Sequence, residues 1–160
     1  MAERTSAGIL LYRRPAGAGG GLEVLLAHPG GPYFAKRDAG DWTIPKGEPD
    51  GADEALAAVA RREFAEETGT EIDPLATMIE LGTIVQKGGK VVHAWAVEGD
   101  LDPAAARSNE FEVEWPPRSG VRARFPEIDR VEWFDPAEAR LRIKPTQAPF
   151  LDRLEAVVEG

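Results

Sequence analysis

The sequence predicts an α/β fold in a single domain, because short strand-like segments and helical segments follow one another along the chain. The apolar runs are bounded by glycine and proline, and two stretches have helical spacing. With 160 residues and 42% hydrophobic content, the chain is long enough to bury a sizeable core. We therefore expect residues 1–160 to form one domain. The order of strands and helices alone allows several topologies.

Three short strands are predicted in the first part of the chain. Residues 6–12 and 22–27 are apolar runs, and the glycine-rich segment 16–21 between them predicts a flexible hairpin loop. We expect these two runs to pair as antiparallel strands. Residues 42–44 predict a third, shorter strand that leads into the segment 45–47.

Residues 56–68 predict a helix, since they contain no proline or glycine and are rich in alanine, leucine, arginine and glutamate. Gly69 follows directly and suits a left-handed cap at the end of the helix. We therefore expect the helix to end just before Gly69.

The second half of the chain predicts two hairpins. Residues 81–86 and 91–97 flank the turn 87–90, in which two glycines follow a lysine. After a linker, apolar and charged residues alternate in the segments 110–115 and 121–125, which predicts a charged outer hairpin.

Two further elements complete the prediction. Residues 129–134 predict another strand. Residues 147–158 carry apolar side chains at helical spacing and predict a terminal helix whose apolar stripe packs on the core.

The helix 56–68 carries an acidic cluster at the end where negative charge is least favourable. Glu63, Glu66 and Glu67 fall within an arc of about 100° on one face. Each like-charge neighbour costs roughly 0.2–0.5 kcal/mol, and each negative charge near the helix C-terminus costs roughly 0.3–1 kcal/mol more. Hard oxygen ligands at this density suit Mg²⁺ or Mn²⁺. The alternative is a solvated acidic face without a ligand.

The residues around this cluster resemble the Nudix box, the signature of hydrolases that split a nucleoside diphosphate linked to another group. Gly47 is followed by six residues, then Glu54, seven residues, and the run from Arg62 to Thr70. The family has five residues between its glycine and first glutamate, so the loop 48–53 carries one extra residue. Aligning Asp53 instead would keep five residues. We prefer Glu54, because it preserves the spacing to Arg62 and an insertion is tolerated better in a loop than in a helix.

The resemblance implies an α/β/α sandwich with a mixed sheet between helices. It also implies that Glu63, Glu66 and Glu67 coordinate one or more Mg²⁺ ions, with Mn²⁺ as a possible substitute, and that the backbone carbonyl of Gly47 is a further ligand. Thr70 stands where the family usually has an aliphatic residue.

Arg62 is matched to an arginine that pairs with the glutamate at the position of Glu54. Residues eight apart on one helix are about 12 Å apart along its axis. We therefore expect Glu54 to lie in the loop or in the first turn.

The implied reaction is attack of water on a phosphorus atom of a pyrophosphate bridge, with magnesium activating the water and neutralising charge. Glu66 or Glu67 could be the general base if the metal does not fully occupy it. Glu112 and Glu114, with Glu110, are the alternatives from a later segment. Cross-strand pairing with the arginines of the segment 121–125 is the structural explanation for these three.

Positive side chains that could contact the substrate phosphates are Lys46, Lys36 and Arg37. Lys46 is the strongest candidate, because it precedes Gly47 in the metal loop. Tyr33 could stack on a base, although an aromatic residue at such a position more often covers the core.

Composition excludes several other classes of function. The formal net charge is −9, which gives no broad basic surface for a nucleic-acid polymer, and a small nucleotide or nucleoside diphosphate derivative fits better. There is no cysteine, so disulfides, thiolate nucleophiles and cysteine-bound zinc are excluded. No apolar run is long enough to cross a bilayer, and we expect a cytoplasmic protein. The resemblance makes a homodimer possible.

Three functions remain open at this point. The first is a Mg²⁺-dependent pyrophosphohydrolase acting on a nucleoside triphosphate, an oxidised nucleotide or a dinucleoside polyphosphate. The second is a nucleotide-binding regulator with the same fold and no turnover. The third is an interaction domain whose acidic helix only covers the surface.

Overall fold

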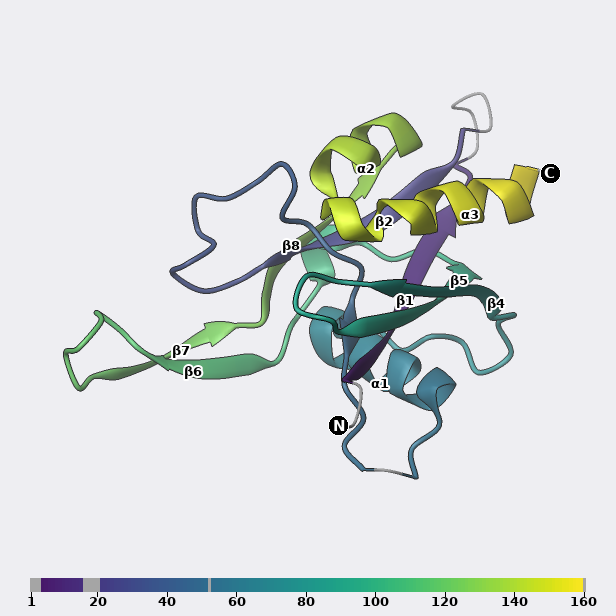
Figure 1. Cartoon of the computed structure of the whole chain (residues 1–160). Coiled ribbons are helices and arrows are strands. Elements are labelled where there is room, and N and C mark those ends of the chain that lie inside the picture. Colours follow the sequence, from purple (N-terminus) through teal and green to yellow (C-terminus); the bar gives the residue numbers. More distant parts are fainter. Residues whose placement is uncertain (1–3, 16–20, 52, 160) are drawn as a thin grey trace.

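A mixed sheet forms the centre of the computed structural model, which describes residues 4–15, 21–51 and 53–159. Five strands follow the order β4-β5-β1-β2-β8, and the short β3 pairs with β1. The strands, labelled in Figure 1, are β1 (Thr5–Arg13), β2 (Glu23–Pro29), β3 (Lys46–Gly47), β4 (Ile79–Val85), β5 (Val91–Glu98) and β8 (Ile128–Phe134).

Parallel and antiparallel pairs are combined in this sheet. β1 and β5 run parallel, with Thr5 opposite Val91, while the remaining neighbours are antiparallel. The predicted pairing of β1 with β2 is confirmed and places Tyr12 opposite Val24. Residues 16–20 of the predicted hairpin loop lie outside the described residues.

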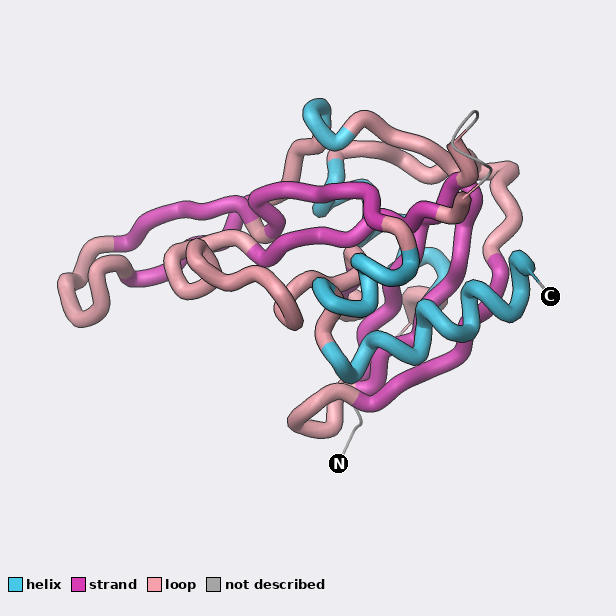
Figure 2. Tube along the Cα trace, turned by 90° about the horizontal axis from the view of Figure 1, so that it is seen from above, coloured by secondary structure: helices cyan, strands magenta, loops and turns pink. Residues whose placement is uncertain are grey.

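Helices cover both faces of the sheet, as Figures 1 and 2 show. α1 (Leu56–Thr68) lies on one face, and α2 (Pro136–Arg142) and α3 (Ala148–Glu159) lie on the other. Because side chains alternate along a strand, β1 sends Ile9 toward α1 and Leu10 toward α3. The predicted α/β/α sandwich with a mixed sheet is confirmed.

The prediction of a strand at residues 42–44 was wrong, because these residues form no continuous ladder. Thr43 makes an isolated bridge to Ala27, and Trp42 makes another to Ile143. The backbone groups of residues 42–44 bind different segments. The amide of Ile44, for example, donates to the side chain of Gln147. The ordered strand β3 begins two residues later, at Lys46.

α2 was missing from the prediction, although its start has recognisable signals. Asp135 caps the helix by accepting a hydrogen bond from the amide of Glu138, and Pro136 occupies the first turn. Two short 3₁₀ turns, η1 (Pro103–Ala105) and η2 (Pro145–Gln147), were also not anticipated.

The predicted charged hairpin is confirmed and forms a separate two-stranded sheet. It consists of β6 (Glu110–Glu114) and β7 (Arg122–Pro126), and it projects from the body of the molecule in Figure 1. None of the helices in the described part of the chain combines the length and apolar content that a bilayer crossing requires.

Candidate active site

The loop between β3 and α1 brings the box residues together. α1 begins at Leu56 and ends at Thr68, as the sequence predicts. Gly69 closes it with a left-handed conformation, φ 76°, and its amide binds the carbonyl of Ala65. The acidic residues therefore occupy the last turns of α1, beside β3.

Arg62 ties the helix to the preceding loop. Its Nε and Nη2 donate to the two carboxylate oxygens of Glu54 at 2.9 and 3.0 Å, and Nη2 also donates to the carbonyl of Glu48 at 3.1 Å. Glu54 also accepts from the amide of Asp50. These hydrogen bonds, from Arg62 first, lower the pKa of Glu54 to about 2. Glu54 lies in the loop, so the partner of Arg62 is placed where the resemblance requires it.

Glu63 and Glu67 both reach toward β3. A Cβ added at Gly47 would lie 2.0 Å from the carboxyl carbon of Glu63, so a glycine is needed for this approach. Oε1 of Glu67 accepts a hydrogen bond of 3.3 Å from the amide of Lys46. Two of the three acidic side chains therefore meet at the two-residue strand that carries the proposed carbonyl ligand.

These carboxylates lie where a negative charge is unfavourable without a cation. Burial, then the nearby charge of Glu63, raises the pKa of Glu67 to about 8, and Lys46 only partly offsets this. Burial, then Glu66, raises the pKa of Glu63 as well. A divalent ion would remove both penalties.

The donor set suits a hard divalent cation, since it consists of carboxylate oxygens and a backbone carbonyl. Among the described residues, however, no three acidic or imidazole side chains are grouped closely enough to hold an ion. Nη1 of Arg62 lies between two of them, 2.9 Å from Glu63 and 3.3 Å from Glu66. Binding of an ion by all three glutamates would therefore require this contact to open.

Glu127 is a further acidic residue at this site that the sequence did not indicate. It lies between β7 and β8, and burial raises its pKa. Its amide donates to the carbonyl of Asn109, whose own amide donates to the carbonyl of Glu66. Its charge also contributes to raising the pKa of Glu67. No local pattern distinguishes Glu127, because its position depends on how the hairpin joins the end of α1.

Glu112 and Glu114 lie on the projecting hairpin, and their contacts favour the cross-strand explanation. Arg122 Nε donates to Glu112 Oε1 at 2.8 Å, and Arg124 pairs with Glu110 in the same way. Glu114 accepts from a backbone amide in the hairpin turn. The later-segment carboxylate that the structure places beside the box is Glu127.

The four predicted substrate contacts are divided between two places. Lys46 lies at the box, and burial, followed by repulsion from two other lysines, lowers its pKa to about 8. Lys36, Arg37 and Tyr33 lie on the β2–β3 loop, which runs beside the hairpin. The structure does not bring these three residues to the box.

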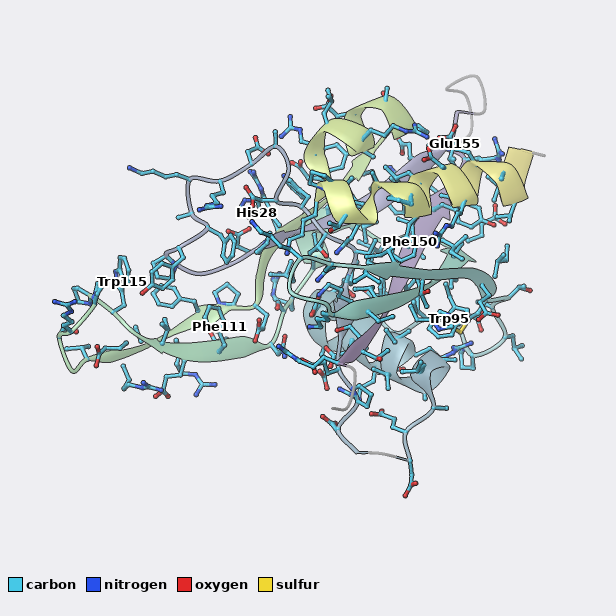
Figure 3. All side chains as sticks on the ribbon, viewed as in Figure 1. His28, Trp95, Phe111, Trp115, Phe150 and Glu155 are labelled. Carbon is cyan, nitrogen blue, oxygen red and sulfur yellow. The ribbon has the colours of Figure 1, made fainter. Side chains whose placement is uncertain are left out.

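The β2–β3 loop and the hairpin contact each other through aromatic rings. Figure 3 shows Phe111 and Trp115 on the side of the hairpin that faces this loop. The rings of Tyr33 and Trp115 meet edge to face at 5.4 Å, and Gly31 packs against Phe111. Tyr33 remains 58% exposed.

A cavity of about 240 Å³ opens beside Glu67. Arg107 and Arg130 contribute positive charge to its lining, whereas Glu67 and Asp129 contribute carboxyl groups.

Comparisons with known proteins agree with the fold and the box. The NUDIX domain family model matches residues 2–154. An Ap4A hydrolase of C. elegans, in a binary complex, aligns with a TM-score of 0.69 and 21% identity, covering 97% of this chain and 98% of that one. The NUDIX domain of Shewanella oneidensis NrtR, complexed with ADP ribose, aligns with a TM-score of 0.66 and 16% identity. The alignment covers 99% of this chain and 90% of that one.

A third similar structure is RenU, a Nudix hydrolase from M. smegmatis, with a TM-score of 0.60, 21% identity and coverage of 98% and 86%. No curated protein matches the sequence significantly. The family model covers nearly the whole chain and includes the box. The chain therefore belongs to the Nudix family of hydrolases.

Proposed function

We propose that this protein is a Mg²⁺-dependent pyrophosphohydrolase that cleaves a nucleoside diphosphate linked to another group. The observation that carries the proposal is the approach of Glu63 and Glu67 to β3, where burial and then the charge of a neighbouring glutamate raise the pKa of each carboxyl group. Such an arrangement is unfavourable by itself and becomes favourable when a divalent cation is bound.

Glu63, Glu66, Glu67 and the carbonyl of Gly47 would hold the ion. When bound, it would supply charge neutralisation for the phosphate oxygens and a more acidic water. Arg62 would keep the loop before α1 in place through its two hydrogen bonds to Glu54 and one to the carbonyl of Glu48. It is thus a positioning residue, and Lys46 would contact a phosphate oxygen.

Glu127 is our proposed acceptor for the proton of the attacking water, with Glu66 and Glu67 as alternatives. Its backbone is held on both sides, since its amide binds Asn109 and its carbonyl accepts from Gly30. This anchoring fixes the backbone of Glu127 beside the end of α1, and its charge is felt by Glu67. General-base assistance is typically worth about 10²–10⁴-fold in rate.

One of the similar structures is an Ap4A hydrolase, and another is in complex with ADP ribose. These two names suggest ligands with different numbers of phosphates. We propose a small nucleotide of this general kind. The regulator without turnover is the alternative, but none of the box glutamates is missing. The cytoplasmic location and the homodimer stay predictions.

A product-resolved screen tests the proposal. Purified protein with Mg²⁺ is incubated with nucleoside triphosphates, dinucleoside polyphosphates and nucleoside diphosphate sugars, and the products are separated by ion-exchange chromatography. We expect cleavage at a phosphoanhydride bond that stops when a chelator is added and falls by orders of magnitude in Glu67→Gln. Nucleotide binding without cleavage of any compound would support the regulator. Cleavage that survives the chelator would contradict the metal requirement.

A further inference from the structure

His28 is a buried histidine near the end of β2, and it is one of only two histidines in the chain. Its exposed fraction is 2%, and its ring meets the Trp42 ring edge to face at 5.2 Å. Figure 3 labels His28 beside the β2–β3 loop. A buried polar ring requires hydrogen-bond partners, and the partners of His28 determine which charge it carries.

Both ring nitrogens of His28 face groups that accept hydrogen bonds. Nε2 lies 2.6 Å from the backbone carbonyl oxygen of Arg37, and Nδ1 lies 2.8 Å from Oδ1 of Asp129. A carbonyl oxygen can only accept, and so can an ionised carboxylate, the ordinary state of a carboxyl group that is 36% exposed. Both contacts are therefore hydrogen bonds only when both ring nitrogens are protonated. We call these two hydrogen bonds the His28 bridge.

Loss of one proton would break one half of the His28 bridge. A neutral ring has one N–H group and one nitrogen lone pair. With Nε2 bound to the carbonyl of Arg37, the lone pair of Nδ1 would face a carboxylate oxygen of Asp129, and two acceptors 2.8 Å apart repel each other. Since the folded state holds the proton in a hydrogen bond, the bridge is complete at low pH and is lost as the pH rises through the titration of His28.

The charged side chains around the ring come from three elements. β8 supplies Asp129 and Arg130, and the Arg130 guanidinium lies 5.1 Å from the centroid of the Trp42 ring. Other charged side chains pair with one another at the β2–β3 loop and the end of α2, namely Arg37 with Asp41 and Asp38 with Arg142. Asp129 is bonded to the ring of His28 itself, so its negative charge favours the protonated form most directly.

The His28 bridge joins the β2–β3 loop to the segment that carries Glu127. The carbonyl of Arg37 belongs to the loop, and Asp129 lies two residues after Glu127, at the start of β8. Gly30 adds a backbone contact between the same two segments, because its amide donates to the carbonyl of Glu127 at 2.8 Å. One side chain and one backbone hydrogen bond thus hold the loop against the start of β8.

The segment held in this way lies beside the box. The amide of Glu127 donates to the carbonyl of Asn109, and the amide of Asn109 donates to the carbonyl of Glu66, both at 2.8 Å. Asp129 and Glu67 line the same cavity. A change in the contact of Asp129 can therefore reach the acidic cluster through neighbouring segments.

We propose that His28 is a positioning residue whose doubly protonated ring holds the β2–β3 loop against the segment 127–129, and that loss of one proton releases this hold. The catalytic part of the inference rests on the proposed function, in which Glu127 accepts the proton of the attacking water. A general base must lie within hydrogen-bond reach of that water, so a less firmly held Glu127 lowers kcat.

Nuclear magnetic resonance of the histidine rings tests the bridge without any substrate. The ring signals of His28 and His93 are followed from about pH 5.5 to about pH 9, with His93 as the internal control. Amide exchange, corrected for the intrinsic effect of pH, is measured for Gly30 and Arg37 and for the control amide of Gly99. We expect the protection of Gly30 and Arg37 to fall roughly 10-fold or more, with the same midpoint as the loss of the proton from His28, while Gly99 stays protected.

Asp129→Asn separates a contact that depends on charge from simple packing. The asparagine amide can donate to the lone pair of Nδ1 while Nε2 still donates to Arg37, so a neutral ring satisfies both contacts. We therefore expect Asp129→Asn to keep the loop protected over the whole pH range, and its kcat relative to the wild type to rise across the titration of His28. His28→Gln should lower kcat more than the matched control His93→Gln. Thermal melting checks that all variants are folded.

Two results would overturn the inference. One is a His28 ring that keeps a single charge state over the whole range, or loop protection that does not follow its titration. The other is a kcat ratio between Asp129→Asn and the wild type that stays constant across that titration, which removes the positioning role. If ring and loop titrate together but no compound is hydrolysed, the proposed function fails and the His28 bridge stands.

Discussion

Replacing Glu67 by glutamine should make the metal-free protein more stable at neutral pH. The pKa of Glu67 is raised from 4.5 to about 8, mainly by burial and by the charge of Glu63. The folded state therefore binds a proton more tightly than the unfolded state does. For a carboxyl group this means that the folded protein loses stability as the pH rises from about 4.5 to about 8, and loses none below that range.

The expected gain in stability follows from the difference between the pKa values of Glu67 in the folded and unfolded states. One pH unit corresponds to about 1.4 kcal/mol, and at pH 7 the folded protein keeps Glu67 mostly protonated while the unfolded chain ionises it, so this difference costs at most about 3 kcal/mol of stability. Glutamine has the same shape and no charge, and Glu67→Gln should recover most of this free energy. The gain should disappear as the pH falls below about 4.5, where Glu67 becomes protonated in the unfolded state as well.

Urea denaturation, monitored by tryptophan fluorescence, measures the free energy of unfolding of each variant, since the chain has four tryptophans. The wild type, Glu67→Gln and the exposed control Glu71→Gln are compared between pH 4.5 and 8 in the presence of a chelator. Millimolar Mg²⁺ should then stabilise the wild type more than Glu67→Gln, because the ion binds the folded state. A Glu67→Gln variant that is no more stable than the wild type at pH 7, with parallel pH profiles, would refute the reasoning.

Three other substitutions test separate parts of the account. Arg62→Ala removes both hydrogen bonds to Glu54 and should lower kcat roughly 10-fold or more, while circular dichroism shows a retained fold. Gly47→Ala places a Cβ 2.0 Å from the carboxyl carbon of Glu63, so it should weaken Mn²⁺ binding in a metal titration. Leu154→Ala empties a fully buried position under α3 and should cost about 2–5 kcal/mol in urea denaturation with unchanged metal binding. A wild-type value in any of these assays would contradict the role assigned to that residue.

Local sequence was sufficient for elements whose signals lie within a few residues. The helix at 56–68 has no glycine or proline inside and a glycine directly after it, and its limits were predicted correctly. The strand prediction at 42–44 failed because its backbone groups bind three different segments, which the local pattern does not reveal. α2 has an Asp135-Pro136 start, but only seven residues, too few for a clear helical period.

The site was predictable only where its residues belong to one motif. Arg62 and Glu54 lie eight positions apart, and the spacing of the box was enough to pair them. Glu127 depends on contacts between segments that are far apart in the chain, since its amide binds Asn109 and the amide of Asn109 binds the carbonyl of Glu66. Lys46 was predicted through its neighbour Gly47, which belongs to the box.

Titration of the protein with Mn²⁺, followed by the electron paramagnetic resonance signal of the free ion, tests the central claim most directly. We expect the wild type to bind Mn²⁺ at or below millimolar concentration and to release it when Mg²⁺ is added in excess. Binding should be at least about 10-fold weaker in Glu63→Gln and in Glu67→Gln. A wild type that binds no ion at millimolar concentration, or variants that bind it equally well, would contradict the account.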